Sequence, residues 1–163
     1  MNLLWAPWRI RFILEGLKEP GCVFCKAIRS NDDSKHLILH RSEHSFTILN
    51  KYPYNSGHLM VVPNRHTGNF TDLSVEELSD IHQEIQRAVL ALTDSMRPQG
   101  FNVGMNIGEA GGAGIRDHLH YHVVPRWNGD TNYLPVLGET KVLPEGLEET
   151  CARILQVYKK TRS

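Results

Sequence analysis

Three histidines at alternate positions, His118, His120 and His122, are the densest group of side chains in the sequence that could carry chemistry. A neutral imidazole can act as a nucleophile, transfer a proton or bind a metal ion. If the segment is a β-strand, successive side chains point to opposite faces, so the three rings share one face at spacings of about 6 to 7 Å. The sequence therefore predicts a row of imidazoles along one edge of a site.

This histidine row has three interpretations. Three unrelated, partly buried histidines are the simplest, but the strict alternation beside apolar residues argues against chance. A hydrolytic zinc site with three histidine ligands is the second, although three positions along one strand span too far for one tetrahedral ion without distortion. In the third, an imidazole nitrogen attacks phosphorus and a phosphohistidine intermediate divides one displacement into two easier steps.

A glycine-rich segment directly before the histidines favours the third interpretation. It reads Gly108-Glu109-Ala110-Gly111-Gly112-Ala113-Gly114. Glycine allows positive φ and close approach of the backbone to a ligand, and successive N–H groups in such a turn form a concave anion site. Glycine-rich loops are common for turn geometry alone, but one joined to a histidine row would hold a phosphate next to the imidazoles.

The cysteines offer a second possible centre. Cys22 and Cys25 form a C-x-x-C pair and Cys151 stands alone, which suits metal or redox chemistry in a reducing compartment better than a disulfide framework. A redox pair usually follows a strand and opens a helix of a βαβ unit, and no such pattern is visible. A zinc site would need two more ligands.

The elements that position these residues can be read from the pattern. Residues 45–50 and 57–63 predict a hairpin, and residues 101–107 and 118–125 alternate as strands. Ser74 with Glu77 is a capping box, followed by an amphipathic helix that ends before Pro98. A closing helix is expected over residues 145–160. We predict one α+β domain over residues 1–163, with a twisted antiparallel sheet of about five strands and one long helix.

Composition limits the partners. The chain has 163 residues, with 18 basic and 18 acidic side chains, so no net charge attracts a nucleic acid polymer or an anionic membrane. Residues 1–20, with Trp5 and Trp8, lack a continuous apolar stretch and predict an arm packed on the body formed by residues 21–163. A cytoplasmic location is expected. The tryptophans, including Trp127, are expected in the core or an interface rather than on a base, and the remaining histidines, such as His40 and His82, at the solvated surface.

These motifs together resemble the histidine triad family. Its signature, His-φ-His-φ-His-φ-φ, is matched by residues 118–124. The segment from Asn50 to Pro63, with Gly57-His58, is similar to the hairpin that binds ribose in that family, and Pro125-Arg126 follows the triad. These segments look most like the branch that contains bacterial diadenosine tetraphosphate phosphorylases and fragile-histidine-triad-like proteins.

The resemblance implies roles for individual residues. His120 would be the nucleophile, His118 and His122 would flank it, Asn50 would meet the ribose and His58 would support the site from behind. The other expected substrate contacts are a base pocket walled by Phe46 and Leu49, the polar side chain of Asn106, and charge stabilisation by the backbone N–H groups of Gly112, Ala113 and Gly114.

The same resemblance completes a metal site and suggests a reaction. Some members bind structural zinc through a C-x-x-C pair, a histidine after the hairpin and the first triad histidine, here Cys22, Cys25, His66 and His118. No organic cofactor and a homodimer are implied. The expected activity is cleavage of dinucleoside polyphosphates or related nucleotidyl phosphates through a nucleotidyl-histidine, as a hydrolase or phosphorylase.

One departure from the family pattern affects the leaving group. Many members place Gln and then Ser or Thr four and three residues before the first histidine, where this chain has Gly114 and Ile115. Side-chain hydrogen bonds to a leaving phosphate are therefore missing. The alternatives are a nucleoside phosphoramidase or nucleotidyltransferase of the same family, a nucleotide-binding module with little turnover, and a metal-dependent hydrolase.

Overall fold

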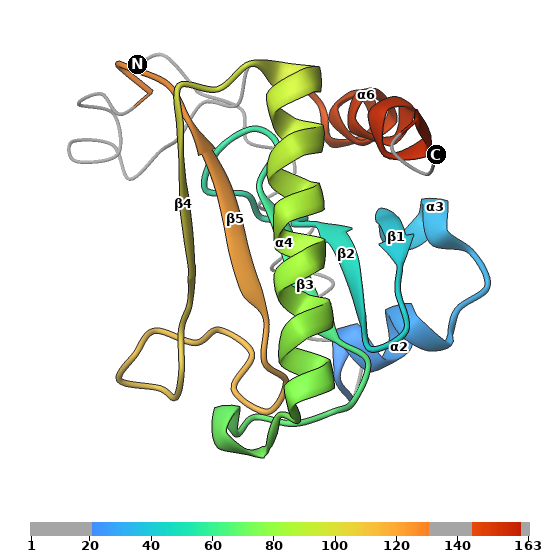
Figure 1. The fold of residues 1–163 in the computed structure, drawn as a ribbon, viewed down its shortest axis with the longest axis vertical. Coiled ribbons are helices and arrows are strands. Elements are labelled where there is room, and N and C mark those ends of the chain that lie inside the picture. Colours follow the sequence, from blue (N-terminus) through green and yellow to red (C-terminus); the bar gives the residue numbers. More distant parts are fainter. Residues whose placement is uncertain (1–20, 131–144, 161–163) are drawn as a thin grey trace, which may run out of the picture.

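The computed structural model describes residues 21–130 and 145–160. The arm expected at residues 1–20, with Trp5 and Trp8, lies outside the described residues. Five strands form one antiparallel sheet in the order β1-β2-β3-β5-β4, which confirms the predicted α+β class (Figure 1). The strands are β1 (Ile38–Arg41), β2 (Ser45–Leu49), β3 (Leu59–Pro63), β4 (Gly100–Met105) and β5 (Tyr121–Arg126).

One long helix lies over one face of the sheet, roughly alongside β4 and β5 (Figure 1). Helix α4 (Val75–Met96) begins with the predicted capping box, in which the Ser74 hydroxyl accepts from the Glu77 amide and the Glu77 carboxylate accepts from the Ser74 amide. The closing helix is α6 (Leu147–Lys160), which packs on α4 and β1. Three short helices were not predicted: α2 (Val23–Arg29), α3 (Asp33–His36) and η1 (Phe70–Asp72).

The two faces of the sheet bury different cores. Leu59, Val61 and Val123 pack beneath α4 and α6. Phe46, Met60 and Val62 face the other way and pack against Phe24 and Ala27 of α2. Because side chains alternate along each strand, every residue of β2, β3 and β5 belongs to one of these two faces. The register Met60↔His122 places His122 on the α2 face.

The strand that carries the histidines begins later than predicted. Regular pairing starts at Tyr121, because the Leu119 amide donates to the Thr67 carbonyl at 2.8 Å instead of joining the sheet ladder. The alternation nevertheless extends back through the triad, since Leu119 and Tyr121 pack in the core beneath α4. His118, His120 and His122 therefore share the opposite face, as expected.

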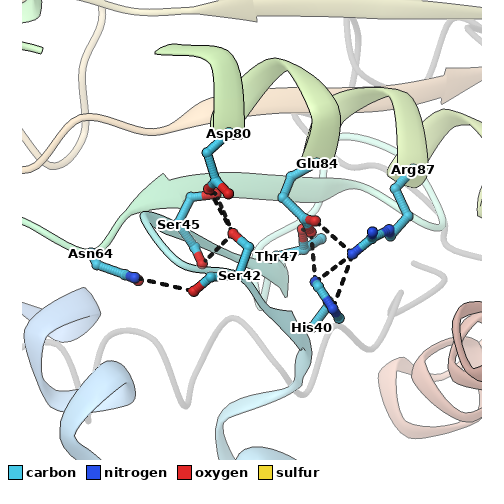
Figure 2. Close-up of polar contacts among 8 residues, drawn as sticks. All are labelled: His40, Ser42, Ser45, Thr47, Asn64, Asp80, Glu84 and Arg87. Atoms are coloured by element: carbon cyan, nitrogen blue, oxygen red, sulfur yellow. Dashed lines mark hydrogen bonds and ion pairs between the residues drawn. The ribbon is translucent and has the colours of Figure 1, made fainter. Parts of the chain in front are cut away.

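A buried polar network fastens α4 to the first two strands (Figure 2). Asp80 accepts hydrogen bonds from Ser42 and Ser45, both at 2.6 Å. Glu84 lies within hydrogen-bond distance of Thr47, His40 and Arg87, at 3.1, 2.9 and 2.8 Å. The expectation of a solvated His40 is wrong, because its side chain is only 13% exposed.

No helix among residues 21–130 and 145–160 has the length and apolar character needed to span a bilayer.

Candidate active site

His120 is held with one nitrogen ready for attack. Its Nδ1 lies 2.9 Å from the carbonyl oxygen of His118, which can only accept, so Nδ1 carries the proton. A neutral imidazole protonated on Nδ1 has its lone pair on Nε2. Burial lowers the pKa of His120, which keeps the ring neutral at physiological pH. The Nε2 atom is therefore a nucleophile without prior proton removal.

The third histidine of the triad is set by hydrogen bonds to present a donor. The Tyr54 amide, at 3.0 Å, and the Asn50 side-chain amide, at 3.3 Å, both point at Nδ1 of His58. Because these groups donate, the proton of neutral His58 sits on Nε2 and is donated to Nδ1 of His122, 2.9 Å away. His122 in turn carries its proton on Nε2.

The Nε2 atom of His122 is buried and has no hydrogen-bond partner among the described residues. A buried N–H without an acceptor costs free energy, so such groups in native proteins often mark a binding site. The His122 ring lies at a centroid distance of 5.0 Å from that of His120. A lone pair and an N–H donor thus stand side by side on one face of the sheet.

The first triad histidine turns away from this pair and joins the cysteines. Nε2 of His118 donates to the Pro63 carbonyl at 2.9 Å, which leaves the lone pair on Nδ1. That atom lies 3.3 Å from Sγ of Cys22, 3.6 Å from Sγ of Cys25 and 3.2 Å from Nδ1 of His66. The ligand atoms of all four residues lie within 4.8 Å of one another.

This four-residue cluster has the shape of a tetrahedral metal site. Bonds of about 2.0 Å to nitrogen and 2.3 Å to sulfur place tetrahedral ligand atoms about 3.3 to 3.8 Å apart. Four of the six separations between these ligand atoms, 3.2 to 3.6 Å, are close to these edges, and all six are at most 4.8 Å. The cluster can therefore hold a metal ion between two thiolates and two imidazoles.

The backbone around the cluster is tightly packed. A Cβ added at Gly68 would lie 2.5 Å from the carbonyl oxygen of Arg116 and 3.1 Å from Cα of Asp117. Only glycine allows the two chain segments to approach this closely. The segment that follows His66 and the segment that precedes His118 are consequently in backbone contact.

The glycine loop folds on itself. The Gly112 amide donates to the Glu109 carbonyl at 2.9 Å, and the Ala113 amide donates to the Gly108 carbonyl at 3.1 Å. Asn106, expected beside a phosphate, instead donates to the Gly112 carbonyl at 3.4 Å. Two of the three expected anion-binding amides are thus used within the loop in this structure, and the Gly114 amide remains the candidate.

The two residues expected to wall a base pocket lie on opposite faces of the sheet. Leu49 is 1% exposed and packs beneath α4, on the face opposite to the histidines. Phe46 is on the histidine face but is fully buried against Phe24. Ile48 and Met60 lie on the same face as His122 and were not predicted. Asn50 accepts from the Tyr52 amide at 2.9 Å in addition to contacting His58.

Two aromatic residues at the site also escaped prediction. The centroid of the Phe24 ring lies 5.3 Å from that of His118 and 5.1 Å from that of His120, so α2 packs against the nucleophile. The Tyr54 ring lies 5.5 Å from that of His122 and is 53% exposed. Both reach the triad from segments distant in sequence, and no local pattern marks them.

The sequence is similar to those of known proteins. The HIT domain family model matches residues 31–129. An AP-4-A phosphorylase of Mycobacterium tuberculosis is 38% identical over 92% of this chain and 80% of its own length. Adenosine 5'-monophosphoramidase hnt1 of Schizosaccharomyces pombe is 29% identical over 66% of this chain and 76% of its own length.

A solved structure agrees in fold. A Zn-bound histidine triad family protein from Mycobacterium smegmatis superposes with a TM-score of 0.70 and 28% identity, covering 86% of this chain and 95% of that one. The family match spans more than half of the chain and includes the triad, the hairpin and the glycine loop. This protein therefore belongs to the HIT domain family.

Proposed function

We propose that this protein cleaves dinucleoside polyphosphates, such as diadenosine tetraphosphate, or related nucleotidyl phosphates by forming a covalent nucleotidyl-His120 intermediate. The observation that carries the proposal is that two neighbouring rings have complementary roles. His120 has a lone pair on Nε2, and His122 has a buried Nε2–H without a hydrogen-bond partner among the described residues. The relative named AP-4-A phosphorylase supports this class of substrate.

In the first step, the lone pair on Nε2 of His120 attacks the α-phosphorus and forms a P–N bond. The bond between the α-phosphorus and the bridging oxygen breaks, and its electron pair leaves with the departing nucleotide. His120 Nδ1–H stays hydrogen-bonded to the His118 carbonyl, which stabilises the charge that the ring acquires. His122 Nε2–H donates to an oxygen of the phosphate, where negative charge is concentrated.

In the second step, an oxygen nucleophile attacks phosphorus and the P–N bond breaks, returning its electron pair to Nε2 of His120. Water as the nucleophile yields AMP and loses a proton to solvent, whereas orthophosphate yields ADP. Product analysis distinguishes the two outcomes. Diadenosine tetraphosphate should give ATP and AMP by hydrolysis, and ATP and ADP when orthophosphate is the acceptor.

The intermediate itself can be tested by substitution. His120→Ala should abolish an acid-labile adduct with labelled diadenosine tetraphosphate and lower kcat by at least about 10³-fold, since it removes the nucleophile. His82→Ala is the matched control, because His82 lies exposed on α4. An adduct that persists in His120→Ala would contradict the proposal. A wild-type protein that binds the nucleotide without forming the adduct would be a binding module.

We propose zinc as the metal of the four-residue cluster. Two thiolates and two imidazoles suit Zn²⁺, and a Zn-bound relative of this fold supports the assignment. The ion would have a structural role, since holding His118 also holds the carbonyl that orients His120. Elemental analysis of protein purified without added metal should give about one equivalent of zinc per chain. Less than half an equivalent would contradict the assignment.

A structural ion also predicts how metal removal acts. Chelation should lower kcat by misplacing His120 and should lower the melting temperature at the same time. In a metal-dependent hydrolase, kcat would fall to zero while the fold remained unchanged. We also propose a cytoplasmic location, which is supported by Cys22, Cys25 and Cys151 forming no disulfide.

We also propose a homodimer formed through β4. This strand is at the edge of the described sheet. Val103 within it is 48% exposed, and Ile107, which follows it, is 51% exposed. An exposed, apolar edge strand favours pairing with a second copy. Val103→Lys should shift the protein to a monomer in sedimentation, whereas Leu90→Lys on the exposed side of α4 should not. Monomeric wild-type protein would contradict the proposal.

A phosphoramidase is the second candidate. The relative named adenosine 5'-monophosphoramidase favours it, and Gly114 and Ile115 offer no side-chain hydrogen bond to a leaving phosphate. Comparing kcat/KM for adenosine 5'-monophosphoramidate and diadenosine tetraphosphate decides between them. A ratio above about 10 in favour of the phosphoramidate would assign the second activity.

A further inference from the structure

We infer that Asn55 and Asp130 form a clamp that sets the proton position on His122, and that Asn55 is a positioning residue for the reaction. This inference deepens the proposed function and rests on it for its catalytic consequence. The starting observation is the buried side-chain amide of Asn55, in the loop that precedes β3. Asn55 is 7% exposed, so its polar atoms must be satisfied within the protein.

The Asn55 side chain connects two segments that are distant in sequence. Its Nδ2 donates to the Pro125 carbonyl at 3.0 Å and to Oδ2 of Asp130 at 2.7 Å. Pro125 is part of β5, the strand that carries His122. The loop at residues 50–58 is therefore fastened to the far end of the triad strand.

Asp130 is itself held rigidly. Arg126 binds its carboxylate with two N–H groups, at 2.7 and 2.8 Å, and the Trp127 amide donates to Oδ2 at 3.1 Å. A bidentate guanidinium pair fixes the plane of a carboxylate as well as its charge. The acceptor that Asn55 meets is thus preorganised by the residues that follow β5.

The clamp determines which atom of the loop reaches His58. The backbone carbonyl of Asn55 accepts from the His58 amide at 3.1 Å, and the preceding residue, Tyr54, presents its own amide to Nδ1 of His58. Without the clamp, this amide is free to move away from the ring. Only the longer bond from the Asn50 side chain, at 3.3 Å, then holds Nδ1 of His58 as an acceptor, so His58 is less strictly confined to the form that has its proton on Nε2.

A change at His58 passes directly to His122. If His58 Nε2 loses its proton, Nδ1 of His122 becomes the donor between the rings, and Nε2 of His122 is left with a lone pair. A lone pair directed at an anionic phosphate oxygen repels it, whereas an N–H attracts it. The clamp therefore acts on the charge developing at phosphorus without touching the substrate.

The test compares two asparagines with the same kind of bond. Asn55→Ala removes the clamp, and Asn64→Ala removes an amide that donates to backbone carbonyls of Ser42 and Glu43 in the hairpin between β1 and β2. Long-range ¹H–¹⁵N spectra of the full chain report the tautomer of each histidine. We expect Nε2–H on His122 in wild type and in Asn64→Ala, and a mixture of tautomers in Asn55→Ala.

Kinetics with diadenosine tetraphosphate give the second readout. Asn55→Ala should lower kcat about tenfold with a change in KM below about threefold, because catalytic geometry is lost rather than binding. An unchanged His122 tautomer in Asn55→Ala, or an equal loss of kcat in Asn64→Ala, would overturn the inference. If Asn55→Ala does not fold, Asn55→Leu, which has a similar side-chain volume but no N–H donor, is measured in the same way.

Failure of the proposed function and failure of the clamp give different experimental results. A wild-type protein that forms no adduct would contradict the proposed function. The tautomer spectra would still test the role of the clamp. An active wild-type protein with His122 protonated on Nδ1 would contradict the inferred role of the clamp. The proposal that His120 is the nucleophile would be unaffected.

Discussion

His122 couples the site to pH through its burial. Burial, and then the charge of His120, lower the pKa of His122 from 6.5 to about 4. The unfolded chain binds a proton near pH 6.5 and the folded chain only near pH 4. This contribution to stability is therefore complete above about pH 6.5 and is lost as the pH falls toward 4.

The pH dependence of unfolding checks this coupling. The free energy of unfolding, measured with denaturant from pH 7 to pH 4, should fall less steeply in His122→Gln than in wild type. The difference should be about 1 kcal/mol after discounting for partial contact with solvent. His82→Gln removes an exposed histidine and should leave the slope unchanged. Parallel curves for His122→Gln and wild type would show that His122 does not titrate in this range.

At the level of single residues, the sequence predicts which face of the sheet a side chain occupies wherever the alternation along a strand determines it. Alternation placed the three triad histidines on one face, and the same rule applied to β2 separates Phe46 from Leu49, which are three positions apart. Tyr54 and Asn55 were missed because their roles depend on contacts with His122 and Asp130, about 70 residues away. Side-chain type alone does not indicate such pairs.

Helix α2 depends on one arginine of the neighbouring strand. Arg41 donates to the carbonyls of Ala27, Ile28 and Ser30 at 3.1, 2.8 and 3.0 Å. These carbonyls lie at the end of α2, where few backbone amides remain as donors, although the Ala27 carbonyl also accepts from the Ser30 amide at 3.2 Å. Because α2 contains Cys25 and Phe24, its attachment supports both the metal cluster and the nucleophile.

Removal of this attachment should loosen the metal site. Arg41→Met keeps a long side chain but loses the donors, so zinc should dissociate faster to a competing chelator, by about tenfold. Arg116→Met is the control, because Arg116 forms a surface ion pair with Glu109 in which both side chains are exposed. The chelator assay would count against the role of Arg41 if both variants released metal at the wild-type rate.

Among the elements, those with strong local signals were predicted. The capping box of Ser74 and Glu77 and the apolar period of the segment are sufficient to predict α4 from the sequence. Strand β1 and helix α2 were missed because both are short, and each is stabilised by a partner from elsewhere in the chain. For α2, these partners are Arg41, which donates hydrogen bonds to its last turn, and Phe46, on which Phe24 packs.

In the whole molecule, the sheet separates stability from chemistry. The triad lies on one face of the sheet. On the other face, Glu84 and Arg87 of α4 contact His40 of β1 (Figure 2). Glu84 is almost completely buried, and its carboxylate forms an ion pair with Arg87 at 2.8 Å and lies within hydrogen-bond distance of His40 and Thr47. The network joins α4 to β1, and the His40 ring stacks on Tyr158 of α6 at 6.1 Å.

Glu84→Gln tests this separation. Loss of the buried charge leaves Arg87 without its partner, and the free energy of unfolding should fall by about 3 kcal/mol. The kcat measured at a temperature where the variant is folded should remain within about twofold of wild type. A large loss of kcat without loss of stability would mean that the two faces are coupled.

The backbone contact at Gly68 sets a limit on how this site can change. There is no space for a methyl group between the chain beside His66 and the chain beside His118. Even a variant in which other side chains replaced the four metal-binding residues would keep these two segments pressed together. Transplanting the triad into another scaffold would therefore require the close backbone crossing and its glycine, as well as the histidines.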